Sequence, residues 1–245
     1  MALYRDEGVV MRTQKLGEAD RIITVFTRKN GVQRLVAKGV RKTSSKFGAT
    51  LEPFMLVDFQ GFEGRTLDTI TQAQLIAPFG SEIIKNYEFY LSANMVVEAT
   101  EKLNEGQAAI EQYQLLVGAL RALARQVIDS QIIRDAYLTR AIALAGWAPE
   151  LSSCVVCSTH DNLIALSVSS GGAVCKSCRP AGAFTVMPET LQLLNAYLRG
   201  DWKEALSATS SSYQQAGGFI AAYLQWHLER NLKSFSLSHR TLTTG

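Results

Sequence analysis

The sequence lacks the motifs that mark most enzymes. Neither G-x-x-x-x-G-K-[ST] nor G-x-G-x-x-G occurs, which excludes a phosphate-binding loop and a dinucleotide fingerprint. No G-x-S-x-G elbow or H-E-x-x-H motif is present, and the only histidines are His160, His227 and His239. These three histidines are scattered along the sequence, and none of them stands out as a candidate catalytic base. We therefore expect a protein that works by binding and is not an enzyme.

Long apolar runs are also missing. The longest uncharged stretch, residues 205–228, is interrupted by serines and glutamines, so it does not resemble a membrane span of about 20 apolar residues. Three charges fall within the first seven residues and no apolar segment follows them, which argues against a secretory signal peptide. With 47% hydrophobic and 19% charged residues, the composition is that of a soluble globular protein. We expect it in the cytoplasm, without membrane contact.

Acidic residues are missing from one part of the chain. The net charge is only +3, but no carboxylate lies between Asp20 and Glu52. That interval holds eight basic residues: Arg21, Arg28, Lys29, Arg34, Lys38, Arg41, Lys42 and Lys46. A run of one charge sign creates a local positive potential that attracts polyanions. An ordinary solvated face is the alternative explanation.

The same region has the pattern of β-strands. Short runs rich in Val, Ile, Thr and Phe predict five strands, at Gly8–Thr13, Arg21–Thr27, Val32–Lys38, Phe54–Gln60 and Leu67–Leu75. Asn30-Gly31 predicts a hairpin with a type I′ turn between the second and third strands. A longer connection, Gly39–Glu52, precedes the fourth. Five short strands in this arrangement favour a small closed barrel of the OB type. The pattern alone leaves an SH3-like barrel open.

Helical periodicity begins at Ser81. Apolar residues spaced three or four apart predict two amphipathic helices, through Ile84–Met95 and Ile110–Val127. Further helices are predicted at Ser130–Ala145 (ended by Gly146), Pro188–Arg199 and Gln214–Lys233. Residues 151–180 lack this period, which indicates an insertion.

All four cysteines lie in that insertion. They form two C-x-x-C pairs, Cys154/Cys157 and Cys175/Cys178, separated by 17 residues. This spacing is typical of a zinc site, and four thiolates fill a tetrahedral Zn²⁺ completely, so we expect one structural zinc ion. Two disulfides or four idle thiols are the alternatives, and a cytosolic chain disfavours disulfides. His160 could replace one ligand but is more simply a polar loop residue.

The connection after the third strand carries the most suggestive chemistry. Lys38, Arg41, Lys42 and Lys46 alternate with Gly, Thr and Ser, a composition suited to following a phosphate backbone. Phe47 could stack on a base, or it could plug the barrel and anchor the loop. Two other classes remain open. A zinc-ribbon adaptor would bind only proteins, and a metal-dependent nuclease would need carboxylates such as Glu18, Asp20, Asp58, Glu63 and Asp68 to converge.

The order of several short motifs resembles the RecO family of bacterial DNA repair and recombination mediators. The motifs are Leu16-Gly-Glu-Ala-Asp-Arg-Ile22, Lys38-Gly-Val-Arg-Lys42, Ser45-Lys-Phe47, Leu51-Glu-Pro-Phe54, the two C-x-x-C pairs and Gln225-Trp-His-Leu-Glu-Arg230. The resemblance spans nearly the whole chain. It implies a non-enzymatic, nucleoid-associated protein of RecF-pathway repair that binds single- and double-stranded DNA and anneals complementary strands. The implied protein partners are RecR, the single-stranded-DNA-binding protein SSB, RecF and RecA.

The resemblance also assigns residues. It implies DNA contacts at Arg28, Arg34, Lys38, Arg41, Lys42 and Lys46, to which Phe47 is added as the stacking candidate. In the family the helical domain receives the acidic tail of SSB, and Arg121, Arg125 and Arg140 are cations available for it. The four cysteines align with the zinc-bearing members.

The predicted fold is therefore α+β and multidomain. An OB-type barrel (residues 1–80) precedes a helical domain in two parts (81–150 and 181–245), and a four-cysteine zinc finger (151–180) is inserted between them.

Overall fold

A computed structural model describes residues 2–104 and 109–228 of the chain. Two compact units divide it, Met1–Ile128 and Asp129–Gly245, and each is described by itself. The first unit contains β1 (Leu3–Leu16), β2 (Asp20–Thr27), β3 (Gly31–Ala37), β4 (Leu56–Phe62), β5 (Asp68–Ala77), α1 (Phe79–Ile83), α2 (Tyr87–Leu103) and α3 (Ile110–Arg125). The domain limits expected at residues 80, 150 and 180 stay a prediction.

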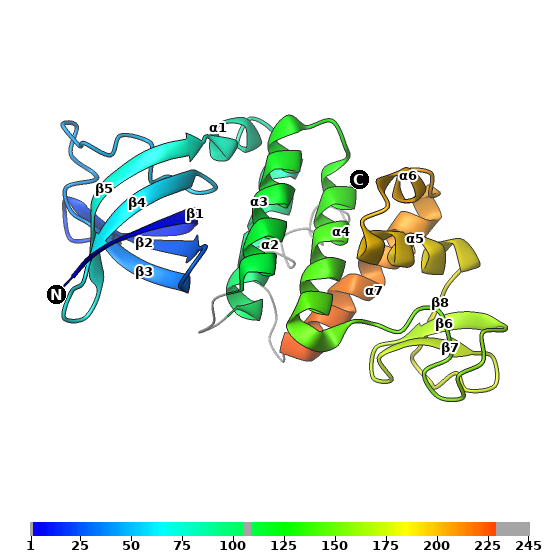
Figure 1. Cartoon of the computed structure of the whole chain (residues 1–245). Helices are drawn as coiled ribbons and strands as arrows, with labels where there is room; N and C mark the ends of the chain where they lie inside the picture. The colour runs from blue at the N-terminus through cyan, green and yellow to red at the C-terminus, as the bar shows by residue number, and fades with distance from the viewer. Residues whose placement is uncertain (1, 105–108, 229–245) are drawn as a thin grey trace. The chain divides into compact units, whose positions relative to one another are not determined.

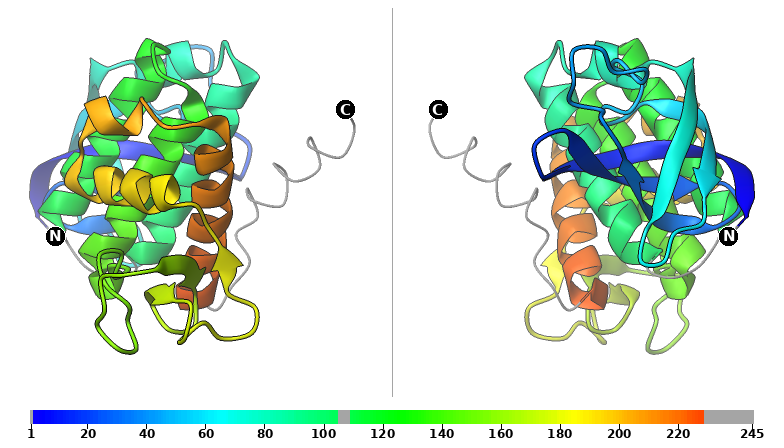
Figure 2. Two further views of the ribbon diagram at one scale, coloured as in Figure 1. Left: turned by 90° about the vertical axis from the view of Figure 1, so that its right-hand side faces the viewer. Right: turned by 90° about the vertical axis from the view of Figure 1, so that its left-hand side faces the viewer.

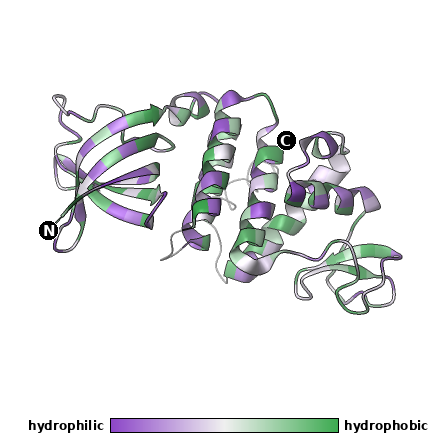
Figure 3. Ribbon diagram, viewed as in Figure 1, coloured by the Kyte–Doolittle hydropathy of each residue, from purple (hydrophilic) through white to green (hydrophobic). Residues whose placement is uncertain are grey.

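The five strands close into a barrel with the order β1-β2-β3-β5-β4 (Figure 1). All neighbours are antiparallel except β3 and β5, which meet in parallel at Leu35↔Asp68 and Val36↔Thr69. Alternate residues of the strands fill the interior, where Val25, Leu35 and Phe59 are buried. Figure 3 shows the matching alternation of apolar and polar residues along the strands. The predicted OB-type barrel followed by helices is confirmed, and this topology is that of an OB fold.

The hairpin between β2 and β3 is confirmed, but its predicted turn type is wrong. Thr27 pairs with Gly31, so three residues form the connection and not two. Gly31 has φ +67°, whereas Asn30 is not among the residues with positive φ, and a type I′ turn needs both. The buried Asp6 carboxylate holds this turn by accepting hydrogen bonds from the Lys29 amide and the Asn30 side chain. A contact from a distant strand thus overrides the local turn signal.

The outer face of β1 and β2 is buried as well, because α2 and α3 cover it. Phe26 contacts the ring of Tyr113 on α3, with 6.1 Å between centroids. The Tyr113 hydroxyl donates to Glu7 on β1 at 2.6 Å, and Arg12 donates to Glu101 on α2. This burial on both faces explains why β2 reads as a continuous apolar run and not as an alternation.

The second unit combines a helix cluster with a small sheet (Figure 2). Helices α4, α5 and α7 pack on one another, and a three-stranded sheet of order β7-β6-β8 lies in the cysteine-bearing insertion. The elements are α4 (Ser130–Ile142), η1 (Ala143–Trp147), β6 (Leu163–Ser167), β7 (Gly172–Cys175), β8 (Phe184–Thr185), α5 (Pro188–Arg199), α6 (Trp202–Ala205) and α7 (Ser210–Leu228).

The helices predicted at Ile110–Val127 and Pro188–Arg199 are found within two residues, but the one predicted through Ile84–Met95 is found as α2, Tyr87–Leu103. Gly146 has φ +88° inside η1, which continues α4, and breaks the helical backbone where the glycine signal predicts. The short helices α1 and α6 and the sheet β6–β8 were not predicted, because four or five residues carry too little periodicity. The last helix is seen as Ser210–Leu228, and residues 229–233 of its prediction lie outside the described residues. Across the described chain, no helix is both long and apolar enough to cross a membrane.

Candidate metal centre and nucleic-acid interface

The four cysteines converge at one end of the small sheet. Cys154 and Cys157 lie on a tight turn in which the Ser158 amide donates to the Cys154 carbonyl at 2.8 Å. Cys175 ends β7, and the Cys178 amide donates to its carbonyl at 3.2 Å. The Val155 amide of the first turn donates to the Ala173 carbonyl on β7 at 3.0 Å, which holds the first turn beside the strand that ends at Cys175. Each C-x-x-C pair thus presents two sulfurs from one turn.

The sulfur geometry suits a tetrahedral metal. All four sulfurs lie within 4.8 Å of one another, and the Cys157 and Cys175 sulfurs are 3.8 Å apart. Zn–S bonds of about 2.3 Å place the corners of a tetrahedron about 3.8 Å apart. A disulfide needs about 2.05 Å, and all four cysteines are free. These four residues could therefore hold one metal ion, with no ligand position left for a substrate.

Two of the four thiols differ in acidity because they share hydrogen bonds within the cluster. Backbone N–H groups, first that of Cys175, lower the pKa of Cys154 to about 6. Hydrogen bonds with the sulfurs of Cys157 and Cys175 raise the pKa of Cys178 to about 12. Without a cation, the hydrogen bonds of the cluster favour the thiolate form of Cys154 and the protonated form of Cys178. A bound divalent cation would displace the remaining protons.

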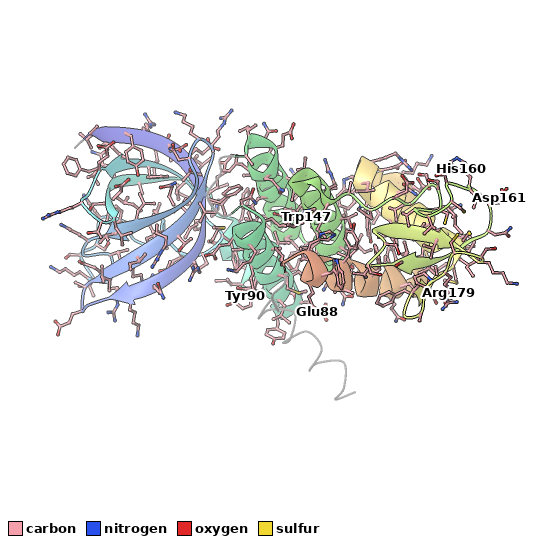
Figure 4. The ribbon with its side chains drawn as sticks, turned by 90° about the horizontal axis from the view of Figure 1, so that it is seen from below. Glu88, Tyr90, Trp147, His160, Asp161 and Arg179 are labelled. Atoms are coloured by element: carbon pink, nitrogen blue, oxygen red, sulfur yellow. The ribbon has the colours of Figure 1, made fainter. Side chains whose placement is uncertain are left out.

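Histidine does not join this cluster. His160 is exposed, and its Nδ1 lies 2.9 Å from the Ser152 carbonyl, to which it donates. Figure 4 labels it beside Asp161 on the loop that leads into β6. In the part of the chain that the structure describes, the four cysteines are the only group of three or more His, Cys, Asp or Glu that could share a metal.

The carboxylates that a nuclease would need have other partners. Asp20 accepts from the Gly39 amide at 2.7 Å, and Asp58 forms an ion pair with Arg5 at 2.7 Å. Asp68 accepts from the Tyr4 hydroxyl, and Glu63 accepts from the Ala2 amide. Asp20, Asp68 and Glu63 thus stabilise strand ends or turns, and Asp58 forms a cross-strand ion pair between β1 and β4.

The predicted DNA contacts fall at two ends of the β2–β3 ribbon. Lys38, Arg41 and Lys42 follow β3, where Ala37 pairs with Arg21. Arg28 lies in the turn at the other end, where Thr27 pairs with Gly31. Six residue steps separate the two ends, about 20 Å at 3.4 Å per residue. All six predicted cations are exposed, and Arg34 lies between the ends, opposite Thr24.

The end of the ribbon at Lys38 gathers cations, and we call it the cationic loop end. It comprises Lys15, Lys38, Arg41, Lys42 and Lys46, all exposed. Three carboxylates also lie at this end, but Asp20 accepts from the Gly39 amide and Glu52 is paired with Arg21, so the cations outnumber the acids. Lys15 was missed in the sequence because it precedes Asp20 and so lies outside the run without acids. The strand register could have found it, since Lys15 pairs directly with Arg21 across the β1–β2 hairpin.

Two cations of this end also anchor the loop. The Arg41 guanidinium donates to the carbonyls of Gly17 and Glu18 at 3.1 and 2.8 Å. The Lys46 ammonium donates to the Thr71 carbonyl on β5 at 2.6 Å. Among the described residues, the side chains of Lys38 and Lys42 have no hydrogen-bond or ion-pair partner. These two ammonium groups are therefore fully available to a ligand.

The opposite end, at Arg28, is electrically mixed. Arg28 and Lys29 lie near three carboxylates, those of Asp6, Glu7 and Asp58. The hydrogen bonds from Arg5, and then the charges of Arg5 and Lys29, hold the pKa of Asp58 below its usual value. Nearby negative charge cancels the positive potential that a phosphate would feel. This end is a poorer polyanion site than the sequence suggests.

The base-stacking role expected of Phe47 is contradicted. Its side chain is only 3% exposed and packs in the barrel core with residues such as Leu51 and Phe59. The ring is the plug that anchors the loop, and the Lys46 ammonium lies 5.2 Å from its centroid. A base cannot reach its face in this conformation.

The candidate partner-binding arginines belong to different compact units. Arg121 and Arg125 are exposed and lie four residues apart on α3, so they share one helix face. Arg140 is half-buried on α4, in the other compact unit. Its guanidinium lies close to Gly200, which ends α5 with φ +71°.

Comparison with known proteins places this geometry in a family. The family model described as "Recombination protein O N terminal" matches residues 1–79, and "Recombination protein O C terminal" matches residues 85–235. The chain belongs to the RecO family. Both halves of the RecO pattern are thus present, the first over the barrel and the second over the segment with the cysteines and helices.

Relatives named RecO are similar over nearly their full length. A protein named DNA repair protein RecO from Frankia casuarinae is 48% identical over 242 residues, which cover 98% of this chain and 100% of the relative. A protein of the same name from Streptomyces coelicolor is 47% identical over 242 residues, covering 96% and 98%. The similarity to these relatives therefore extends over both compact units.

Proposed function

We propose that this chain is a DNA-binding protein of repair and homologous recombination, and that the cationic loop end of its barrel is the main DNA contact. The observation that carries the proposal is the set of five exposed cations at one end of an OB-type barrel. OB folds bind nucleic acids on surfaces of this kind, and the relatives at 47–48% identity are named DNA repair proteins.

Strand annealing follows from the same chemistry. Two DNA strands repel each other through their phosphates. A cationic surface that binds both strands lowers this repulsion and holds complementary bases close enough to pair. No nucleotide hydrolysis is needed for this step. Single- and double-stranded DNA both present phosphates, so both are proposed ligands.

We also propose that this protein acts together with other proteins of the RecF pathway. We expect RecR to act with this protein, and SSB, RecF and RecA to meet it on single-stranded DNA. Arg121 and Arg125 offer two positive charges on one face of α3, a suitable site for an acidic peptide such as the SSB tail. Arg140 lies apart from them in the sequence and is a separate candidate.

The four cysteines are proposed to hold one structural zinc ion. The cysteine segment buries little apolar surface, since its core cluster consists of a few small residues such as Ala165, Val174 and Ala183. A segment of this kind needs a metal to fold. We expect zinc to hold the turns at Cys154 and Cys175 together and to take no part in chemistry.

The test compares two double variants that remove the same charge. K38Q/K42Q removes the two unpartnered ammonium groups, and R28Q/K29Q removes two cations at the mixed end. Affinity for a fluorescent single strand is measured by anisotropy over a range of salt. Each lost phosphate contact lowers the salt slope by about 0.7 and the affinity at about 0.1 M salt by about fivefold. K38Q/K42Q should therefore bind about 25-fold more weakly, and R28Q/K29Q within about twofold of the parent.

Other outcomes would change the assignment. Equal losses in both variants would contradict the cationic loop end as the main contact. A parent protein without affinity for DNA would favour a protein-binding adaptor, and degradation of the strand on adding Mg²⁺ would favour a nuclease. Far-UV circular dichroism of both variants checks that the fold is kept, because none of the four side chains is buried.

A further inference from the structure

We propose that the cationic loop end contacts only the phosphate backbone of DNA. No side chain of this surface then stacks on a base, and the bases of a bound strand are free to pair. This inference rests on the proposed DNA binding and goes beyond it, because it names the part of the nucleic acid that is recognised. It predicts that this protein binds a strand from which every base has been removed as tightly as an ordinary strand.

The first observation concerns stacking. The segments that build the cationic loop end, residues 13–22 and 38–55, contain two aromatic residues, Phe47 and Phe54. They are 3% and 1% exposed, so neither presents a ring face to solvent. Phe47 fills the barrel core, and Phe54 packs against Tyr90 with 6.0 Å between centroids. The stacking platforms that OB folds use for single strands are missing from this surface.

The second observation concerns base edges. Base edges are read by Asn and Gln at adenine and by Arg or Lys at guanine, and among the cations Arg alone has a fixed fork geometry. Residues 38–55 contain no Asn or Gln, and residues 13–22 contain one, the exposed Gln14. The two arginines of these segments are engaged within the protein, since Arg41 donates to the carbonyls of Gly17 and Glu18 and Arg21 is paired with Glu52. The loop is therefore poorly equipped to read base identity.

What the loop does present suits phosphates. Lys38 and Lys42 offer unpartnered ammonium groups, and Thr43 and Ser44 offer exposed hydroxyls beside them. Lysine ammonium groups are point charges that bind phosphate oxygens without a fixed geometry. Contacts of this kind position a strand and carry no sequence information.

One barrel aromatic needs a separate test. Phe62 ends β4 and is 37% exposed, the largest exposed fraction of any aromatic in the described barrel. Glu63 follows Phe62 in the chain. Phe62 pairs with Thr69 on β5, and Thr69 follows Asp68. These carboxylates oppose an approaching phosphate chain, so we assign no stacking role to Phe62. The conservative variant F62L examines this assignment directly.

The experiment measures binding of the full chain to two labelled strands of equal length. One has an ordinary mixed sequence, and the other carries abasic tetrahydrofuran sugars at every position, which keeps the phosphates and removes the bases. The two affinities should agree within about threefold, and their salt slopes should be equal. Loss of even one stacked base would weaken binding to the abasic strand by about fivefold to 150-fold.

The outcomes separate the inference from the proposed function. Equal binding of both strands, together with a loss of equal size for both in K38Q/K42Q, supports backbone recognition. Binding of the ordinary strand with a tenfold or greater loss on the abasic strand overturns the inference while leaving DNA binding intact. Binding of neither strand overturns the proposed function itself. A tenfold loss on the ordinary strand in F62L would likewise overturn the inference.

Discussion

Gly217 and Gly218 are neighbours in α7, yet the structure predicts opposite effects when each is replaced by alanine. A Cβ on Gly217 would lie 2.9 Å from Oδ2 of Asp135 on α4, closer than real Cβ atoms come to other heavy atoms. A Cβ on Gly218 would meet no atom within 4 Å. Both positions have ordinary helical backbone, because neither has a positive φ.

The size of the expected change in the free energy of unfolding for G217A follows from the contacts of the Asp135 side chain. Its side chain is 7% exposed, and its carboxylate accepts from Arg134 Nε at 2.7 Å. Relieving the clash means turning the carboxylate away from Arg134 or shifting α7. Breaking a buried ion pair costs about 3–5 kcal/mol, and replacing a helical glycine by alanine returns about 1 kcal/mol. G217A should therefore lose about 2–4 kcal/mol, and G218A should gain about 1 kcal/mol.

Urea unfolding followed by far-UV circular dichroism measures both changes, with G218A as the matched control. The double variant D135A/G217A tests the cause, because the added methyl group then has no carboxylate to displace. In the D135A background, G217A should be neutral or stabilising. The reasoning is refuted if G217A stabilises the protein as much as G218A, or if its penalty is unchanged without the Asp135 carboxylate.

Three further predictions concern other parts of the chain. Metal analysis of protein purified without chelators should find about one zinc per chain, and C178S should lose its metal to a chelator first; less than half an equivalent in the parent would contradict the site. Burial raises the pKa of Asp135 despite the charge of Arg134, so the native state holds this proton more tightly than the unfolded state. Relative to D135N, the parent's free energy of unfolding should therefore fall as pH rises above about 4, and a difference that grows with pH would be inconsistent with this burial. Y113F removes the hydrogen bond to Glu7 and should lower the free energy of unfolding by about 1.5 kcal/mol, measured in urea; an unchanged midpoint would show that this bond contributes nothing.

Most of the strands and helices could be predicted from local sequence patterns. The strands β2, β3 and β4 were predicted within two residues, because their apolar runs are bounded by Asn, Gly and Pro. β1 was predicted to start at Gly8 but starts at Leu3, since the charges at Arg5, Asp6 and Glu7 hide its first half. That half pairs with β4 from Leu3↔Phe62 onward, a contact between residues far apart in sequence. Pairing of this kind leaves no local signal.

In the candidate site, too, features with a local sequence signal could be predicted, whereas those that depend on contacts between distant residues could not. The cluster of four cysteines could be predicted because each C-x-x-C pair is a local turn, and the spacing between the pairs is typical of zinc sites. The cationic surface could be predicted only in part. Closeness in sequence joined Arg28 to Lys38, whereas the β2–β3 ribbon places them at opposite ends and brings Lys15 beside Arg21 instead. The burial of Phe47 also depends on the closed barrel, which no local pattern contains.

In the proposed DNA complex, the position of Phe47 determines how much the loop must rearrange on binding. A loop of this length without an anchor would become ordered on binding, and the lost chain entropy would weaken the complex. Here the ring is held in the barrel interior, and Arg41 and Lys46 fasten the part of the loop that precedes it. The backbone of the loop is therefore arranged when the protein folds, and only the tips of the lysines adapt to the ligand. Replacing Phe47 with a small residue would thus reduce affinity for DNA without removing a single charge.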